Sequence, residues 1–322
     1  MLTAVGVGGV MAVLAIAIGG AAFGRSDAQG VQAMGWFIIA LIPLTVVLAA
    51  VRTPEHISTD LSTHSFALRD YWSVLTKPDL VRLFLAQMAL TLGPGWMSAI
   101  YLFFFKDSRG FSTQQASILL AVYILAGVPG ALMTAALARR IGKHHTLMAT
   151  TTAFSLGIMT ILIAPKGNVL AALPSMIWCG AMAAGFDLMI RAMLADVGDE
   201  VRLDQGKQRM SLLYAVNALA TKIAAAFAIG LTFPLLARLG YTPADGAVNT
   251  PAAIGHLEAA FLIGPIIFVM LGGACLIGWR LDAKRHGEIR AKLEARDAAL
   301  EDEPTPAWGA LSGPPLDPEI SG

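Results

Sequence analysis

The residue best suited to chemistry in this chain is a lysine, Lys222, that lies inside a long apolar stretch, Met210–Ala237. It follows Arg209 by 13 residues, which is ~20 Å of helix rise and places it near the middle of a bilayer. A lysine at that depth costs ~2.5–3.5 kcal/mol on insertion scales, so such side chains normally face water or a counter-ion. Lys222 is therefore predicted either to line a cavity, where it handles a solute or a coupling ion, or to anchor helix packing.

Asp187 is the nearest acidic candidate partner for Lys222. It precedes Asp196 by nine residues, or ~14 Å of helix rise, and so lies ~6 Å shallower than Lys222. An extended lysine side chain bridges that gap if the two helices touch. Alternatively, Asp187 pairs with Arg191, four residues further along the same helix. The sequence leaves both pairings open.

Aromatic and amide side chains in other apolar stretches are candidates for the wall of the same cavity. Trp96 follows Gly93-Pro94-Gly95, a pattern that predicts a break in a helix and free carbonyl groups at mid-depth. Its indole suits either stacking on a ring-shaped solute or helix packing. The remaining candidates are cavity-lining groups or simply buried hydrogen-bonding groups: Gln87, Tyr123, Trp178, Tyr214 and Asn217.

Composition places the chain in a membrane. Of its 322 residues, 56% are hydrophobic and only 14% are charged, against about 25% charged in soluble domains. The net charge of +1 argues against nucleic-acid binding. Cys179, Cys275 and the six histidines lack metal-ligand spacing, and the sequence contains no catalytic or nucleotide-binding motif that we recognise. We therefore expect no enzyme activity, metal or cofactor.

Eight stretches are long and apolar enough to cross a hydrocarbon core of ~30 Å as helices. They predict an all-α polytopic membrane protein: Leu2–Phe23, Val31–Val51, Leu83–Phe105, Ala116–Ala138, Thr146–Ala164, Val169–Phe186, Met210–Ala237 and Ala259–Trp279. Of the 23 Lys and Arg residues, 17 fall on alternate connections and the C-terminal tail, and five fall on the other connections. The positive-inside rule then predicts an inner (plasma) membrane protein with both termini in the cytoplasm.

The segments between these stretches divide the chain into five parts. Residues 1–51 hold two spans, residues 52–82 form a cytoplasmic linker, and residues 83–280 hold six spans. Within the linker, Leu68, Tyr71, Trp72 and Leu75 share one helical face, which predicts a short amphipathic helix at the membrane surface. Residues 281–300 predict a second, more basic amphipathic helix, and the proline-rich residues 301–322 are predicted to be disordered.

Three polar segments carry motifs of a known family. The longest is Leu194-Ala-Asp-Val-Gly-Asp-Glu-Val-Arg-Leu-Asp-Gln-Gly-Lys-Gln-Arg209, followed by Tyr214 and, eight positions later, by Lys222. The other two are Arg109-Gly-Phe-Ser112 before a span and Ala138-Arg-Arg-Ile-Gly-Lys143 after it. In these motifs the chain resembles the glycoside–pentoside–hexuronide:cation symporters of the major facilitator superfamily, which include the melibiose permease. The resemblance runs over about residues 1–296.

The resemblance implies a twelve-helix transporter with two six-helix halves that works by alternating access, in which the eight predicted spans correspond to the last eight helices. It places Lys222 at the cation and sugar site, with Na⁺ or H⁺ as the coupling ion. The implied partners are a small polar solute, the coupling cation and membrane lipid. A cytoplasmic gating motif carries over residue by residue: Arg139, Arg140, Gly142, Lys143, Asp196, Asp199, Gly206 and Arg209.

Departures from the family keep three functions open. The early helices that carry the family's coupling carboxylates have no counterpart here, and Asp187 stands where the melibiose permease has a sugar-stacking tryptophan. The leading hypothesis is cation-coupled symport of a sugar, a glycoside or a related polar solute by an N-terminally incomplete chain. The alternatives are a non-transporting remnant or membrane interaction subunit, and a lipid or amphiphile carrier of the same superfamily.

Overall fold

The computed structural model describes residues 27–52, 76–205, 210–244 and 247–301. The predicted span Leu2–Phe23, the amphipathic helix of the linker, Gly206, Arg209 and the proline-rich tail therefore lie outside the described residues. The described residues form helices and no strands, which confirms the all-α class.

Six described helices are long and apolar enough to cross a membrane, and each overlaps one predicted span. They are α4 (Pro78–Phe103, continued by the π-helix η1, Phe104–Ser108), α5 (Thr113–Ile141), α6 (Lys143–Met159, continued by the 3₁₀ turn η2, Thr160–Leu162), α7 (Val169–Gln205), α8 (Met210–Arg238) and α9 (Pro251–Ala274). Helix α2 (Asp27–Arg52) coincides with another predicted span, but its described apolar stretch, Gly35–Val47, is shorter than these six. Six of the predicted spans are thus described as long apolar helices, and the count of eight remains a prediction.

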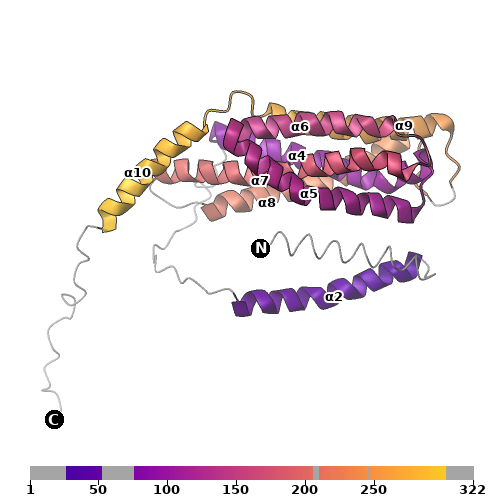
Figure 1. Ribbon diagram of the computed structural model, residues 1–322, viewed down its shortest axis with the longest axis horizontal. Coiled ribbons are helices and arrows are strands. Elements are labelled where there is room, and N and C mark those ends of the chain that lie inside the picture. Colours follow the sequence, from indigo (N-terminus) through magenta and orange to yellow (C-terminus); the bar gives the residue numbers. More distant parts are fainter. Residues whose placement is uncertain (1–26, 53–75, 206–209, 245–246, 302–322) are drawn as a thin grey trace, which may run out of the picture.

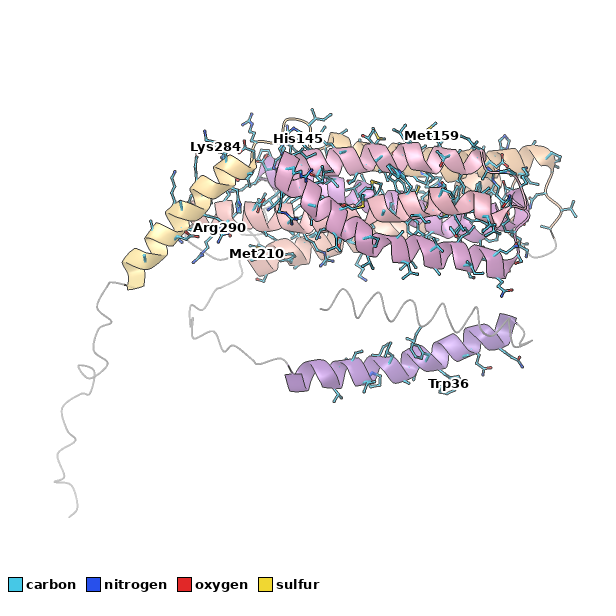
Figure 2. All side chains as sticks on the ribbon, viewed as in Figure 1. Trp36, His145, Met159, Met210, Lys284 and Arg290 are labelled. Carbon is cyan, nitrogen blue, oxygen red and sulfur yellow. The ribbon has the colours of Figure 1, made fainter. Side chains whose placement is uncertain are left out.

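The six spans lie side by side as one bundle (Figure 1). Within it, α4 packs against both α8 and α9, while α5 and α6 pack against α7. Helix α10 (Ala283–Glu301) leaves one end of the bundle at an angle, and α2 runs apart from it. Figure 2 shows Lys284 and Arg290 on α10 beyond that end, and Trp36 on α2, whose side chain is 65% exposed.

Helix α7 is much longer than the predicted span Val169–Phe186. Its 37 residues correspond to ~55 Å of helix, far more than the ~30 Å of a hydrocarbon core. The acidic motif that follows Leu194 is therefore helical and extends α7 beyond the membrane, where the sequence predicted only a polar connection. Asp196 and Asp199 consequently lie three residues apart on a rigid element.

Glycines allow α5 and α7 to approach closely. A Cβ atom added at Gly180 of α7 would lie 2.0 Å from the carbonyl oxygen of Tyr123 on α5. A Cβ atom added at Gly130 of α5 would lie 2.2 Å from the carbonyl oxygen of Ala181. Small residues at such crossings bring backbones into van der Waals contact, which drives helix association in lipid.

The predicted break at Gly93-Pro94-Gly95 is wrong. Helix α4 continues through Pro94 without interruption. The two glycines serve packing instead: an added Cβ atom at Gly93 would lie 2.7 Å from Val269 of α9, and one at Gly95 would lie 2.9 Å from Ala228 of α8. Close neighbours on both sides hold this part of α4 in the helical conformation.

Polar contacts join the loops at the end of the bundle opposite to α10. Glu258 of α9 accepts a hydrogen bond of 2.6 Å from Ser108 of η1 and lies 3.5 Å from Lys166, in the connection between α6 and α7. Tyr241 donates a hydrogen bond to Asp107. Burial, and then this hydrogen bond, raise the pKa of Tyr241, so its hydroxyl stays protonated as the donor.

The glycine contact between α5 and α7 predicts an asymmetric response to two alanine substitutions. Gly180→Ala forces two backbones apart, and we expect it to cost about 1–3 kcal/mol of stability, measured as a lower midpoint of thermal unfolding in detergent. Gly230→Ala on α8, where no atom lies within 4 Å of the added Cβ, is the matched control and should be neutral or stabilising. Equal midpoints for the two variants would contradict the packing described.

Candidate functional site

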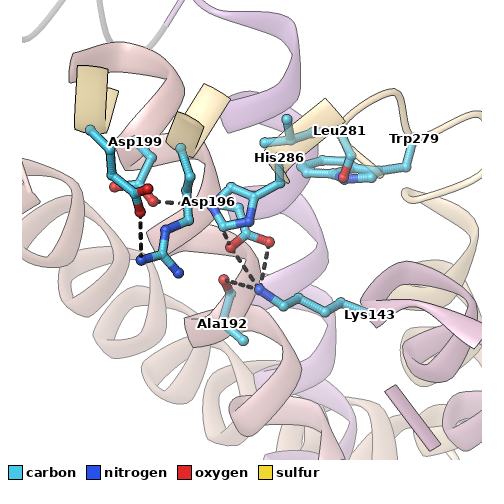
Figure 3. A network of polar contacts seen from close by, with 9 residues as sticks. Lys143, Ala192, Asp196, Asp199, Trp279, Leu281 and His286 are labelled. Carbon is cyan, nitrogen blue, oxygen red and sulfur yellow. Dashed lines mark hydrogen bonds and ion pairs between the residues drawn. The ribbon is translucent and has the colours of Figure 1, made fainter. Parts of the chain in front are cut away.

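A network of charged side chains joins α6, α7 and α10 at the predicted cytoplasmic end of the bundle (Figure 3). We call it the α6–α7–α10 network and define it as Lys143, Asp196, Asp199 and His286, with the flanking ion pair Glu200–Arg285. Its carboxylates are on α7, its lysine is on α6, and its histidine and arginine are on α10.

Gly142 positions Lys143. Its φ angle of 86° lies in the left-handed region, which a glycine adopts without strain. Its N–H donates to the carbonyl group of Ala138 at the end of α5, and its own carbonyl accepts from the N–H of Thr146 in α6. This single residue therefore ends one helix and starts the next, so that Lys143 is the first residue of α6.

Lys143 and Asp196 form the strongest contact of the network. The Lys143 Nζ atom lies 2.6 Å and 2.7 Å from the two carboxylate oxygens of Asp196 and 3.4 Å from the carbonyl oxygen of Ala192. Asp196 is 7% exposed. A buried carboxylate is stable only when it is paired and hydrogen-bonded, so this contact fixes the junction between α6 and α7.

His286 adds α10 to this junction. Its Nε2 atom lies 3.0 Å from Oδ2 of Asp199 and 3.3 Å from Oδ1 of Asp196. Beside it, Arg285 pairs with Glu200 at 2.7 Å. Sequence reasoning missed His286, because a lone histidine in a polar segment carries no pattern. The usable signal was the apolar face of residues 281–300, whose members Ile289 and Leu293 are buried.

A cavity of about 570 Å³ opens beside the network. Side chains of both charge signs line it, from α6, α7 and α10: Lys143, Asp196, Asp199, Arg202, His286, Arg290 and Glu294. Among the other predicted gating residues, Arg139 and Arg140 in the last turn of α5 are exposed, and Gly206 and Arg209 lie outside the described residues.

The structure shows no ion pair between Asp187 and Lys222. Asp187 accepts a hydrogen bond of 2.6 Å from Nε of Arg191, one turn further along α7, so the second of the two sequence alternatives is observed. The side chains of Asp187 and Arg191 are 57% and 63% exposed. Lys222 on α8 is also exposed, and no described residue forms an ion pair with it. Helices α7 and α8 pack against each other far less than α5 and α7 do.

The aromatic candidates for the cavity wall fall into two groups. Trp96 is 6% exposed, its indole N–H donates to the carbonyl group of Ala260 at 3.0 Å, and its ring packs on Gly264, which fits the packing alternative. Trp178 is half-exposed and donates to the carbonyl group of Ala153 at 2.8 Å. Tyr123 is partly buried, and Tyr214 is 39% exposed.

The two amide candidates are buried. Gln87 donates a hydrogen bond of 3.0 Å to Thr91 through Nε2, whereas its Oε1 atom has no hydrogen-bond partner within the described part of the chain. The Oδ1 atom of Asn217 has none there either. Buried amide oxygens are normally paired, so these two acceptors mark positions where a donor fits the interior of the bundle.

Comparison with protein families matches residues 1–283 to the family described as MFS/sugar transport protein. A comparison with curated proteins finds no match.

The network predicts that Asp196 contributes more to the stability of the protein than Asp199 does. Asp196→Asn removes the charge that Lys143 and His286 share, and we expect a loss of roughly 1–3 kcal/mol in thermal or denaturant unfolding of the detergent-solubilised protein. Asp199→Asn, whose side chain is 33% rather than 10% exposed, is the matched control and should cost clearly less. An equal or larger loss for Asp199→Asn would contradict this ranking.

Proposed function

Because the chain belongs to the MFS/sugar transport protein family, we propose that it is a secondary active transporter that moves a sugar, a glycoside or a related polar solute together with a cation, Na⁺ or H⁺. The family and the six apolar helices make it a multi-pass membrane protein of a transport family. The cation coupling and the class of solute are the proposal. Of the alternatives, an enzyme is disfavoured by the family, and nucleic-acid binding by the net charge.

The observation that carries the proposal is a set of charges exposed on membrane-spanning helices. Lys222 lies 12 residues inside α8, and Asp187 and Arg191 lie on α7 immediately after the predicted span Val169–Phe186. Hydrocarbon does not solvate such groups, so the helix faces that carry them must contact water or another polar surface. A water-filled path between helices meets that requirement, and a transporter needs one.

These side chains have complementary roles in the proposed cycle. Lys222 has no counter-ion among the described residues, so its charge is available to a solute hydroxyl or carboxylate, and its ammonium competes with a coupling cation for the same acceptors. The Asp187–Arg191 pair is internally balanced and offers donors and acceptors to a polar solute without net charge. Tyr214, two turns before Lys222 on α8, adds an exposed aromatic ring.

A lipid or amphiphile carrier is the second candidate, and one observation favours it. An apolar groove of about 330 Å³ lies between α8 and α9, with Trp96 of α4 at its base and His256 near its end. Such a lining suits an acyl chain and not a sugar. The two candidates differ in the solutes that affect transport. Transport by a carrier of amphiphiles is inhibited by single-chain lipids and is unchanged by free sugars.

Transport by Lys222 variants tests the proposal. In vesicles containing the purified chain, we expect Lys222→Gln to lower ion-driven uptake from a panel of sugars and glycosides by roughly tenfold or more, because a buried or cavity charge that contacts solute is worth more than 1.4 kcal/mol. Arg238→Gln, at the end of the same helix, is the matched control and should retain uptake.

Uptake is measured with an imposed Na⁺ gradient, an imposed H⁺ gradient and neither gradient. Uptake that neither gradient stimulates would reject cation coupling. Absence of uptake by the unsubstituted chain, with the bundle folded and inserted, would favour the non-transporting alternative.

A further inference from the structure

Helix α10 is held on the bundle through one imidazole placed between two carboxylates. His286 Nε2 lies 3.0 Å from Asp199 and 3.3 Å from Asp196, and the imidazole is 19% exposed (Figure 3). Asp196 and Asp199 lie three residues apart on α7, so their carboxylates share one helical face. The imidazole reaches both because α10 crosses α7 at this point.

The other charged groups that face His286 are lysine, arginine and acidic side chains, which ordinarily keep their charge near neutral pH. One further imidazole, His144 of α6, interacts with Asp282 at the start of α10. Lys143 of α6 forms an ion pair with Asp196. Arg202 of α7 lines the cavity beside the α6–α7–α10 network and has contacts of its own. Two further ion pairs flank the site, Arg285–Glu200 and Arg290–Glu294. Within this described set, histidine is the residue type that ordinarily changes its charge between about pH 5 and about pH 8.

The rest of the contact between α10 and α7 is small. Ile289 and Leu293 are buried, and Arg296 donates a hydrogen bond of 3.5 Å to the carbonyl group of Arg202. The residues between them on α10 are exposed. With the Arg285–Glu200 pair, these are few contacts for a docked helix, so the loss of one ionic contact is enough to shift the ratio of docked to released α10.

We propose that His286, Asp196 and Asp199 form a proton-binding latch that docks α10 on α7 when the imidazole is protonated and releases it when the imidazole is neutral. The protonated imidazole donates from Nε2 and places a positive charge against two carboxylates. Proton loss removes that charge and leaves Asp199 with one ionic contact fewer. Docking is therefore strongest at acidic pH and weakens as the pH rises.

The latch acts on the α6–α7–α10 network and, through it, on α7. The docked α10 lies over the Lys143–Asp196 contact that joins α6 to α7, and so restrains the cytoplasmic end of α7. Its effect on transport rests on the proposed function, whereas its effect on the position of α10 does not. A direct measurement of that position therefore separates a failure of the latch from a failure of the transport proposal.

The test is a distance measurement between spin labels on the full chain in lipid nanodiscs. The labels are attached at Lys292→Cys on α10 and Thr152→Cys on α6, two exposed positions, with Cys179 and Cys275 replaced by alanine. Between about pH 5 and about pH 8, we expect the ratio of docked to released α10 to fall roughly fivefold, the change that ~1 kcal/mol of ion-pair energy produces.

Variants of the histidine identify the group responsible. His286→Arg keeps the charge and should hold α10 docked at both pH values, while His286→Gln should leave it equally released at both. His145→Gln on α6 and Arg285→Gln on α10 are matched controls: the first should preserve the pH response fully, and the second should weaken docking while preserving the response. A docked fraction that is independent of pH, or a pH response that survives in His286→Gln, would overturn the proposal.

Discussion

Hydrocarbon cannot solvate a charge or hydrogen-bond a free backbone group, and the arrangement of this molecule depends on that constraint. It accounts for the helical form of the spans and for the contact of α5 with α7 through glycines, because apolar side chains gain little by leaving lipid for one another. It also makes the exposed charges informative. In water, an exposed lysine such as Lys222 needs no explanation, but inside a span it requires a polar environment.

The two ends of the bundle meet the constraint differently. At the α10 end, ion pairs connect helix to helix: Lys143 binds Asp196, and His286 binds both aspartates. At the opposite end, the two carboxylates Glu258 and Asp107 accept hydrogen bonds from the neutral hydroxyls of Ser108 and Tyr241, and Glu258 also lies 3.5 Å from Lys166. Charge pairs respond to pH and ionic strength, whereas contacts of the second kind do so less. Regulation from the aqueous phase is therefore more readily built at the α10 end.

Most of the fold follows from the sequence, because membrane spans depend on length and apolarity alone. Six apolar helices overlap spans predicted from hydropathy, although α9 begins at Pro251, eight residues before the predicted start at Ala259. The i, i+4 pair of Asp187 and Arg191 is one of the two alternatives that the sequence left open. The errors have local causes. The break expected at Pro94 is absent because its glycines are packed against α8 and α9, and α7 continues past Phe186 because its acidic segment pairs with α6 and α10. His286 was missed because its importance depends on a tertiary contact.

The proposed transport requires that the face of α8 that carries Lys222 meets water inside the membrane. The most direct measurement is the reaction of single cysteines, introduced along α8 from Leu213 to Leu236 in a chain without Cys179 and Cys275, with a water-soluble maleimide. We expect position 222 to react, together with positions that share its face at the helical period of about 3.6 residues, and we expect bound solute to slow the reaction. Reaction confined to the two ends of α8, with position 222 inert, would contradict it.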